Sequence, residues 1–327
     1  MNLMRNQLSA VAAIALSLCS LGAAQAEFKP TQLVSVVVHA GPGGGNDIFG
    51  RALLSIMDKA GLLPVRFQIV NKTGGGSANA RNYLGEKKGD NHTIGLYSST
   101  YLIDPLVQEV ATTTMQDLTP IANLVYEPAL VVVRADSPFK TLKDFIEAAK
   151  ASPNKYKQSA GNALAREAIV RHLLMTKTGA AWTYISFPSA GERISALLGG
   201  HTDMMMIEPS EEAGLVKSGK LRALAQIAKS RISTFPDVPT LKEAGYEITE
   251  VPQVRGVIGP PNMPPEVLAY YSDLFAKAVK TPGWQQYLTE TQLEDGYMNP
   301  EQLKAFQASY TDTMRGVLKS AGIKVNP

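Results

Sequence analysis

The chain has 327 residues, 45% of them hydrophobic, and 32 Lys and Arg against 29 Asp and Glu give a formal net charge of +3 at pH 7. This length is enough for two domains of ordinary size. The near-balanced charge, with no long basic run, argues against a nucleic-acid-binding protein. No segment beyond the N-terminus approaches the roughly 20 apolar residues of a membrane span.

The first 26 residues have the pattern of a secretory signal peptide. Arg5 precedes an apolar segment from about residue 8 to residue 21, and Ala24-Gln25-Ala26 places small residues before a cleavage site near Ala26. Cleavage there also removes Cys19, the one cysteine of the chain. We therefore expect an exported, periplasmic protein without disulfides.

A glycine-rich loop follows the first predicted strand. Residues 34–38 are mostly valine, as in a strand buried on both faces, and Asn46 or Asp47 is expected to cap the helix after the loop. Glycines and the unpaired N–H groups of a helix N-terminus together favour anion binding, although a tight turn without a ligand has the same pattern. The predicted ligand-binding residues here are Gly41, Pro42, Gly43, Gly44, Gly45, Asn46 and Asp47. We expect the N–H groups of residues 43–47 to hold a carboxylate and Asp47 to act chiefly as the cap.

The spacing of the glycines excludes the two familiar nucleotide motifs. A P-loop needs Gly-Lys followed by Ser or Thr, and no lysine follows these glycines. The dinucleotide fingerprint needs a third glycine at position 46 or 48, where Asn46 and Ile48 stand. A small carboxylate is therefore the favoured anion.

Five further predicted strands end in loops of small, hydroxyl-bearing or acidic residues. They are residues 65–69, 93–97, 156–159, 183–187 and 203–207. Ligands of open α/β sheets collect at such strand ends, although a serine there can equally cap the next helix. The further predicted ligand-binding residues are Ser77, Ser98, Ser99, Thr100, Ser159, Asn162, Ala163, Phe187, Pro188, Ser189 and Ser210.

The strand and helix pattern divides into two groups. The first includes the glycine loop and is separated from the second by Glu127–Pro128 and by residues 252–260, while residues 264–280 and 300–321 are predicted outer helices. We expect one lobe from residues 27–127 and 252–327 and a second from residues 128–251.

Catalytic and metal-binding patterns are missing from the sequence. The four histidines, His39, His92, His172 and His201, have no metal-ligand spacing, and there is no Gly-x-Ser-x-Gly elbow. Carboxylates in a site for an anion would repel it, so we expect Glu208 and Glu211 at the rim or hinge. We expect no catalytic residue, no metal and no cofactor.

Six motifs across the chain point to a known family. They are PGGGND at 42–47, NKTGGGSAN at 71–79, SAGN at 159–162, ALLGGHTDMMM at 196–206, KSGKLRALA at 217–225 and FPDVPTLKEAGY at 235–246. This ordered series resembles the periplasmic substrate-binding proteins of tripartite tricarboxylate transporters, also called the Bug family.

The resemblance implies an α/β, two-lobed periplasmic binding protein fold of type II character, with two crossovers and a βα sheet in each lobe. It also implies capture of a small organic carboxylate between the lobes and delivery to integral membrane transporter subunits, by a monomer that binds no nucleic acid. The alternative is a periplasmic enzyme or a sensor-associated binding protein that acts on a small carboxylic acid.

The chain departs from the family pattern at two loops. The usual SAGNGT continues here as Ala163-Leu164, and Phe187-Pro188-Ser189 stands in place of a Pro-Tyr-Lys-Gly-like stretch. Both changes remove polar groups, so we expect a less polar acid than citrate, aromatic or short aliphatic. Lys72 is the one obvious cation within the loops, and Arg255 is expected to pair with a second ligand carboxylate or with Glu250.

Overall fold

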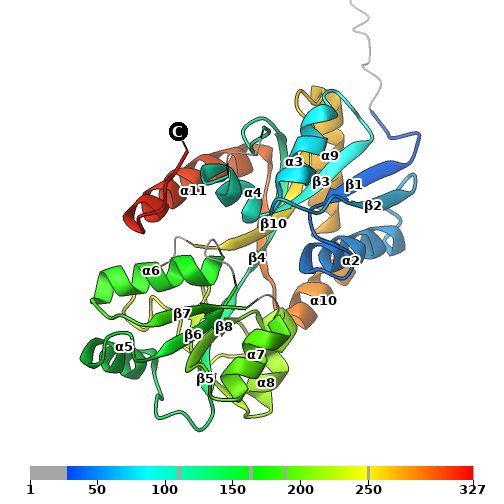
Figure 1. Ribbon diagram of the computed structural model, residues 1–327. Coiled ribbons are helices and arrows are strands. Elements are labelled where there is room, and N and C mark those ends of the chain that lie inside the picture. The colour runs from blue at the N-terminus through cyan, green and yellow to red at the C-terminus, as the bar shows by residue number, and fades with distance from the viewer. Residues whose placement is uncertain (1–27, 109–111, 162–164, 188–189, 249–250, 327) are drawn as a thin grey trace, which may run out of the picture.

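The computed structural model describes residues 28–108, 112–161, 165–187, 190–248 and 251–326, and these form two lobes, each built on one β-sheet with helices around it (Figure 1). The predicted signal peptide and the predicted site residues Asn162, Ala163, Pro188 and Ser189 lie outside the described residues, as do Glu250 and the side chain of Glu211. Within the described residues, no helix combines the length and apolar character that crossing a membrane requires.

The first sheet has six strands in the order β11-β4-β10-β3-β1-β2. Its strands are β1 (Val34–Val38), β2 (Phe67–Asn71), β3 (Thr93–Ser98), β4 (Thr119–Glu127), β10 (Gln253–Gly259) and β11 (Glu294–Met298). β1 pairs in parallel with β2 and β3, whereas β10 is antiparallel to β3 and β4. Val36 packs into one apolar cluster and Val37 into another, so β1 is buried on both faces as its valine run predicts.

The second sheet has five strands in the order β7-β6-β8-β5-β9. They are β5 (Ala129–Arg134), β6 (Lys157–Ala160), β7 (Thr183–Ser186), β8 (Met204–Ile207) and β9 (Leu221–Ile227). β6 is parallel to β7 and β8, and β5 is antiparallel to β8 and β9. The ends of the parallel strands therefore place the loops after β6, β7 and β8 along one edge of the sheet.

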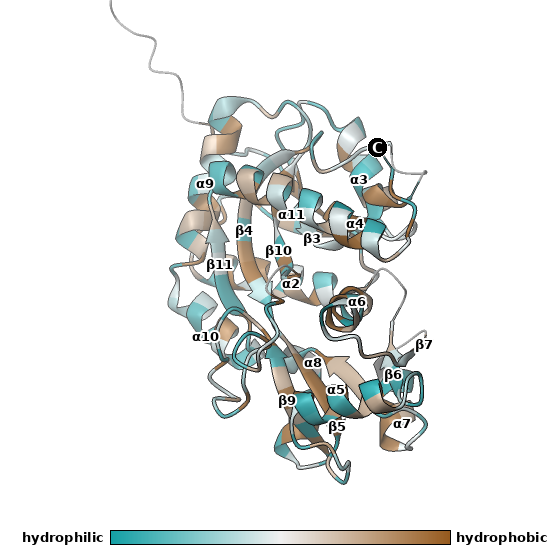
Figure 2. Ribbon diagram, turned by 90° about the vertical axis from the view of Figure 1, so that its left-hand side faces the viewer, coloured by the Kyte–Doolittle hydropathy of each residue, from teal (hydrophilic) through white to brown (hydrophobic). Residues whose placement is uncertain are grey.

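Helices cover both sheets. They are α2 (Gly45–Lys59), α3 (Ala78–Glu86), α4 (Thr100–Ile103), α5 (Leu142–Ala151), α6 (Arg166–Thr178), α7 (Ala190–Leu198), α8 (Pro209–Lys217), α9 (Pro265–Ala278), α10 (Pro282–Thr291) and α11 (Pro300–Ser320), with a 3₁₀ turn η1 (Asp104–Leu106). In Figure 2, β5 is coloured hydrophobic, whereas α3, α9 and α11 carry both hydrophilic and hydrophobic residues. These are the amphipathic helices expected around a sheet.

The chain crosses between the two sheets twice. β4 ends at Glu127 and β5 begins at Ala129, with Pro128 between them, and the return follows β9 and leads into β10. Proline has no N–H for a ladder hydrogen bond, which suits the point where the chain leaves one sheet for another. Two crossings were predicted and are observed, while the residue limits of the lobes remain a prediction.

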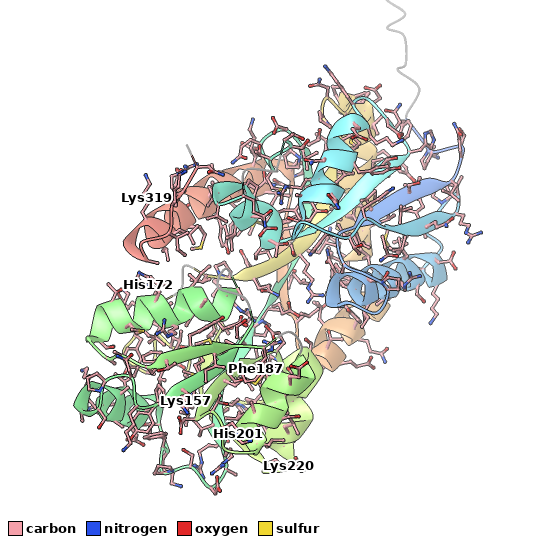
Figure 3. All side chains as sticks on the ribbon, in the orientation of Figure 1. Lys157, His172, Phe187, His201, Lys220 and Lys319 are labelled. Atoms are coloured by element: carbon pink, nitrogen blue, oxygen red, sulfur yellow. The ribbon has the colours of Figure 1, made fainter. Side chains whose placement is uncertain are left out.

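Helix α11 also joins the lobes beside the cleft. It packs on β4 of the first sheet and contacts α6 of the second lobe. Met314 and Leu318 of α11 belong to the same apolar cluster as Val170 of α6. At the end of this contact His172 Nε2 lies 2.9 Å from Ser320 Oγ, and Figure 3 shows His172 on the side of α6 that faces α11.

Candidate functional site

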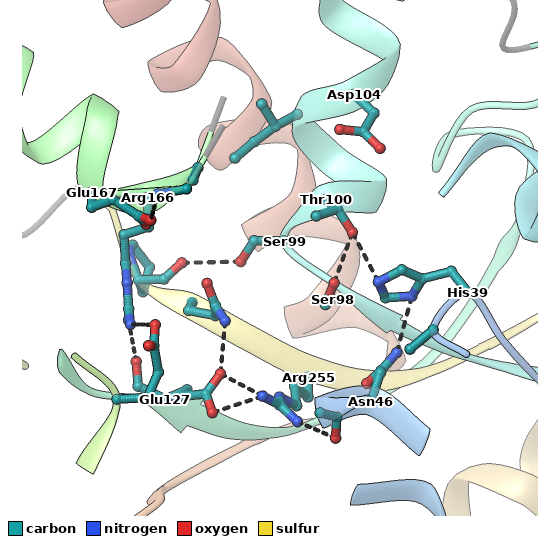
Figure 4. A pocket seen from close by; sticks show the side chains of 18 of the residues that line it. His39, Asn46, Ser98, Ser99, Thr100, Asp104, Glu127, Arg166, Glu167 and Arg255 are labelled. Carbon is teal, nitrogen blue, oxygen red and sulfur yellow. Dashed lines mark hydrogen bonds and ion pairs between the residues drawn. The ribbon is translucent and has the colours of Figure 1, made fainter. Parts of the chain in front are cut away.

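A cavity of about 560 Å³ lies between the lobes, at the ends of strands from both sheets (Figure 4). Both crossing segments contribute to it through Glu127 on one side and Pro252, Gln253 and Arg255 on the other. The remaining lining residues are His39, Ala40, Gly45, Asn46, Ser98, Ser99, Thr100, Ile103, Asp104, Gly161, Ala165, Arg166, Glu167, Ser186, Phe187, Arg193, Glu208 and Tyr310.

The glycine loop reaches the cavity only at its end, where α2 begins. The helix starts at Gly45 after Gly44, so it begins before the Asn46 or Asp47 cap that the sequence predicted. Asp47 lies inside the first turn, and its carboxylate accepts hydrogen bonds from the Gly43 amide at 3.0 Å and from Arg51 and Asn71 at 2.9 Å. The Arg51 hydrogen bond is the main cause that lowers the pKa of Asp47 to about 2. Asp47 therefore holds the loop in place.

Some backbone amides of this turn donate to carbonyls of the turn itself, and two do not. Gly44 donates to the Gly41 carbonyl, and Asp47 and Ile48 both donate to the Gly44 carbonyl. Within the described residues, the amides of Gly45 and Asn46 donate to no backbone carbonyl, and both residues line the cavity. Unpaired first-turn amides are the groups that bind anions at helix N-termini.

The other predicted residues of this loop lie outside the cavity lining. They are Gly41, Pro42, Gly43, Gly44 and Asp47. Gly43 has a φ of +79°, which favours glycine, and a Cβ on Gly44 would come 3.0 Å from the Cβ of Ala40. These glycines shape the turn.

Hydroxyl and imidazole groups form the adjoining wall. Ser98 Oγ lies 2.8 Å from Thr100 Oγ1, and Thr100 Oγ1 lies 3.4 Å from His39 Nε2. Asn46 Nδ2 donates to His39 Nδ1 at 3.2 Å, which places the imidazole proton on Nε2. Burial, followed by the charges of Arg255 and Arg81, lowers the pKa of His39 to about 4. His39 is thus neutral near pH 7 and adds no positive charge to the cavity.

Ser99 connects the first lobe to the returning chain. Its hydroxyl donates to the Pro252 carbonyl at 3.2 Å and accepts from the Val254 amide at 3.0 Å. Ser99 lines the cavity, but these two bonds tie the end of β3 to the second crossing.

An ion pair joins the two crossing segments below the cavity. Arg255 Nη2 lies 2.7 Å from both carboxylate oxygens of Glu127, and Arg255 Nη1 donates to the Gly45 carbonyl at 2.6 Å. Gln253 Nε2 also donates to Glu127 at 2.7 Å. Burial alone would raise the pKa of Glu127, but Arg255 and Arg166 outweigh it and hold that pKa below its usual value. The structure pairs Arg255 with Glu127, which was not among the partners predicted from the sequence, while Glu250 lies outside the described residues.

Arg166 extends this network into the second lobe. It donates to the Glu127 carbonyl and pairs with Glu208 at 2.8 Å. Ser210, a predicted ligand residue, donates to Glu127 at 3.4 Å and lies outside the cavity lining. The network therefore runs from the first turn of α2, through both crossings, to the end of β8.

A third ion pair forms the wall on the second lobe. Glu167 Oε1 accepts from the Gly161 amide at 2.8 Å and from Arg193 Nη1 at 3.2 Å. Phe187 and Ser186 follow along the end of β7, and Figure 3 marks Phe187 there. The predicted residue Ser159 is fully buried outside the lining, where its hydroxyl donates to the Arg193 carbonyl at 2.9 Å.

Asp104 adds a carboxylate to the wall on the first lobe. Its Oδ2 accepts from the amide and the hydroxyl of Ser77, both at 2.9 Å, so Ser77 supports this wall from outside the lining. Burial raises the pKa of Asp104, and the Ser77 hydrogen bonds partly offset that effect. Lys72, the cation expected within the loops, lies over the Tyr83 ring, 4.1 Å from its centroid, and does not line the cavity.

Sequence reasoning missed most of the charged lining. The charged lining residues that it did not select as ligand-binding include Asp104, Glu127, Arg166, Glu167 and Arg193, and it also missed Gln253 and Tyr310. One local signal existed, because Arg166 and Glu167 open the helix that follows the SAGN loop. Within the described residues, no cluster of His, Cys, Asp and Glu is arranged to hold a metal ion.

Comparisons with known proteins agree with this architecture. The model of the tripartite tricarboxylate transporter family receptor, TctC, matches residues 59–323. The UPF0065 protein in the gbd 5' region of Cupriavidus necator is 30% identical, over 96% of this chain and 95% of that protein.

Solved structures share the fold. The crystal structure of a TctC solute binding protein from Polaromonas has a TM-score of 0.77 at 28% identity, covering 89% of this chain and 99% of that chain. The structure of R. palustris Rpa4515 with adipate has a TM-score of 0.78 at 21% identity, covering 91% of this chain and 99% of that chain. These matches confirm the predicted two-lobed α/β binding-protein fold. Because the family model spans most of the chain, this chain belongs to the tripartite tricarboxylate transporter receptor family, which consists of solute-binding proteins and not of enzymes.

Proposed function

We propose that this receptor captures a small organic carboxylate in the cavity between its lobes and delivers it to the integral membrane subunits of a tripartite tricarboxylate-type transporter. The observation that carries the proposal is the start of α2, where the amides of Gly45 and Asn46 have no carbonyl partner among the described residues. A carboxylate supplies acceptors for these amides and for the nearby hydroxyls of Ser98 and Thr100. Rpa4515, which has the same fold, was solved with adipate.

The place of action is proposed to be the periplasm, with the signal peptide cleaved near Ala26 and the mature protein a monomer. Among the described residues, Leu33, Ile48 and Leu198 are the large apolar side chains that are exposed. N-terminal sequencing of the protein from a periplasmic fraction and sedimentation analysis test these two statements.

Ligand binding is proposed to close the lobes about the two crossings, with residues 27–127 and 252–327 in one lobe and residues 128–251 in the other. A ligand that contacts both lobes binds the closed form more tightly and so shifts the population toward it. Solution scattering with and without ligand measures this change. An unchanged radius of gyration at saturation would show a site that is closed beforehand.

A thermal-shift panel of mono-, di- and tricarboxylates tests the function itself. A ligand at 100 times its dissociation constant adds about 2.7 kcal/mol of stability. We expect at least one carboxylate to raise the melting temperature, and isothermal calorimetry then gives its affinity. A shift only with sugars or nucleotides would rule out the carboxylate function.

A further inference from the structure

The charged side chains that line the cavity pair with one another, and this pairing restricts the charge that a ligand can carry. Three arginines line it, Arg166, Arg193 and Arg255, together with four acidic residues, Asp104, Glu127, Glu167 and Glu208. Each arginine already pairs with one carboxylate of the protein, at 2.7 to 3.2 Å. Within the described lining no lysine is present, and His39 is neutral near pH 7.

Two of these arginines are held where a ligand would gain little from them. The side chains of Arg255 and Glu127 are 10% and 2% exposed, and those of Arg166 and Glu208 are 6% and 20% exposed. A ligand carboxylate that took either arginine would separate the buried Glu127 or the partly buried Glu208 from its arginine, which is unfavourable. The positive charge of these two pairs is therefore not available for a second ligand carboxylate.

The third pair presents a hydrogen-bonding surface to the cavity. Glu167 and Arg193 lie on the second lobe, opposite the α2 amides, and their side chains are 11% and 16% exposed. Asp104 on the first lobe also has a counter-ion, because its Oδ2 lies 3.9 Å from Arg81 Nη1. These carboxylates can accept from a neutral or cationic donor of the ligand, whereas a second ligand carboxylate meets only positive charges that protein carboxylates already neutralise.

Asn46 provides a separate indication of a ligand donor. It is 5% exposed and lines the cavity, and its Nδ2 donates to the Leu96 carbonyl at 3.1 Å. Because a carbonyl only accepts, this bond fixes the orientation of the amide and leaves Oδ1 as the remaining acceptor. Asn46 Oδ1 is buried and has no partner among the described residues. An unpaired buried acceptor is unfavourable, and a donor from the ligand or from a water would remove that cost.

On the basis of the proposed function, we propose that the ligand carries a single carboxylate, held at the start of α2, and a neutral or cationic hydrogen-bond donor such as an amide, hydroxyl or ammonium group. Glu167 is the specificity-determining residue that accepts from this donor and disfavours dicarboxylates. The receptor would thus select amido, hydroxy or amino acids over plain dicarboxylates and over the tricarboxylates after which the transporter family is named.

Matched probes of equal chain length test this selection by calorimetry. The four-carbon set is succinate, succinamate and 4-aminobutyrate, and the six-carbon set is adipate, adipamate and 6-aminohexanoate. We expect the best amide or amine of a set to bind at least tenfold more tightly than the dicarboxylate of that set. Equal or tighter binding of the dicarboxylates would overturn the single-carboxylate inference and leave the proposed function standing. Binding of no carboxylic acid in either set or in the wider panel would overturn both.

Substitution of Glu167 tests the residue assignment. Glu167→Gln keeps the size of the side chain and an acceptor for the Gly161 amide but removes the negative charge. We expect the ratio of amine to dicarboxylate affinity to fall at least tenfold in this variant. Glu147→Gln is the control, because Glu147 lies on α5 in an exposed pair with Lys150. Circular dichroism confirms folding of both variants, and an unchanged ratio in folded Glu167→Gln would overturn the assignment.

Discussion

Arg255 Nη2 lies 2.7 Å from both carboxylate oxygens of Glu127, the last residue of β4 before the chain leaves the first sheet. Arg255 stands on β10, the first strand after the chain returns. The pair therefore fastens the outgoing and returning segments at the floor of the cavity. The same guanidinium donates to the Gly45 carbonyl, so the two crossing segments and the first turn of α2 share one side chain.

Removal of the Glu127 charge is expected to destabilise the protein strongly. Glu127→Gln leaves Arg255 buried without its counter-ion, and loss of one partner of a buried pair costs about 3–5 kcal/mol. Urea denaturation at pH 7 measures the free energy of unfolding. The control is Glu147→Gln, whose pair with Lys150 is exposed and contributes less than about 1 kcal/mol. Equal, small losses in both variants would contradict a structural role for the Glu127 pair.

The Glu127 pair also predicts a loss of stability in acid. Its folded-state pKa lies below the usual value, so its contribution is present above the unfolded-state pKa and is lost as the pH falls through the folded-state pKa. We expect the difference in unfolding free energy between wild type and Glu127→Gln to shrink as the pH falls below about 4. A difference that stays constant down to the acid transition would contradict this prediction.

The lowered pKa of His39 predicts that folding stability also depends on pH in a range above that of Glu127. Its pKa of about 4 in the folded protein lies below the ordinary 6.5, so only the unfolded chain takes up this proton between these two values. Wild-type stability should therefore fall as the pH is lowered from 6.5 to 4, by up to about 3 kcal/mol from this group. His39→Asn should lack this component. Chemical denaturation of both proteins at several pH values gives the comparison, and a constant difference across the range would show that His39 does not contribute.

Asp47 is expected to affect ligand affinity although it does not touch the cavity. Asp47→Asn weakens the bonds to the Gly43 amide and to Arg51 that hold the loop before α2. We expect at least a tenfold loss of carboxylate affinity by calorimetry. The control is Asp144→Asn in the capping box of α5, which should cost about 1 kcal/mol of stability and no affinity. Normal affinity in a folded Asp47→Asn variant would show that the turn keeps its geometry without this carboxylate.

A side chain at position 45 is expected to weaken ligand binding. A Cβ there would lie 3.2 Å from Arg255 Nη2, so Gly45→Ala should displace the guanidinium or the first turn of α2 and lower affinity severalfold. Gly214→Ala is the matched control, since no atom lies within 4 Å of its Cβ position on α8. It should raise stability by about 0.5–1 kcal/mol and leave affinity unchanged. Equal affinities in the two variants would contradict close packing of Arg255 on this turn.

The sequence by itself determined the local units. The valine run of β1, the glycine turn and the start of α2 follow each other within 15 residues, so backbone preference and burial predict them without knowledge of distant contacts. Alternation within β1 accounts for Val36 and Val37 in different apolar clusters. The two crossings were also predicted, because the strand and helix units fall into two groups separated by Glu127–Pro128 and by residues 252–260.

Only the tertiary structure decided which charges meet. Glu127 and Arg255 are 128 positions apart, and Arg166 and Glu208 are 42 apart, so no local period connects them. From the sequence, Arg255 was expected to pair with a second ligand carboxylate or with Glu250, a near neighbour in the chain, whereas Glu127 is brought close by the antiparallel pairing of β10 with β4. The loop residues were chosen for backbone access, yet five of the seven lie outside the cavity lining. An ion pair depends on strand order and on which side of the sheet each side chain faces, and those are properties of the assembled sheets rather than of any one segment.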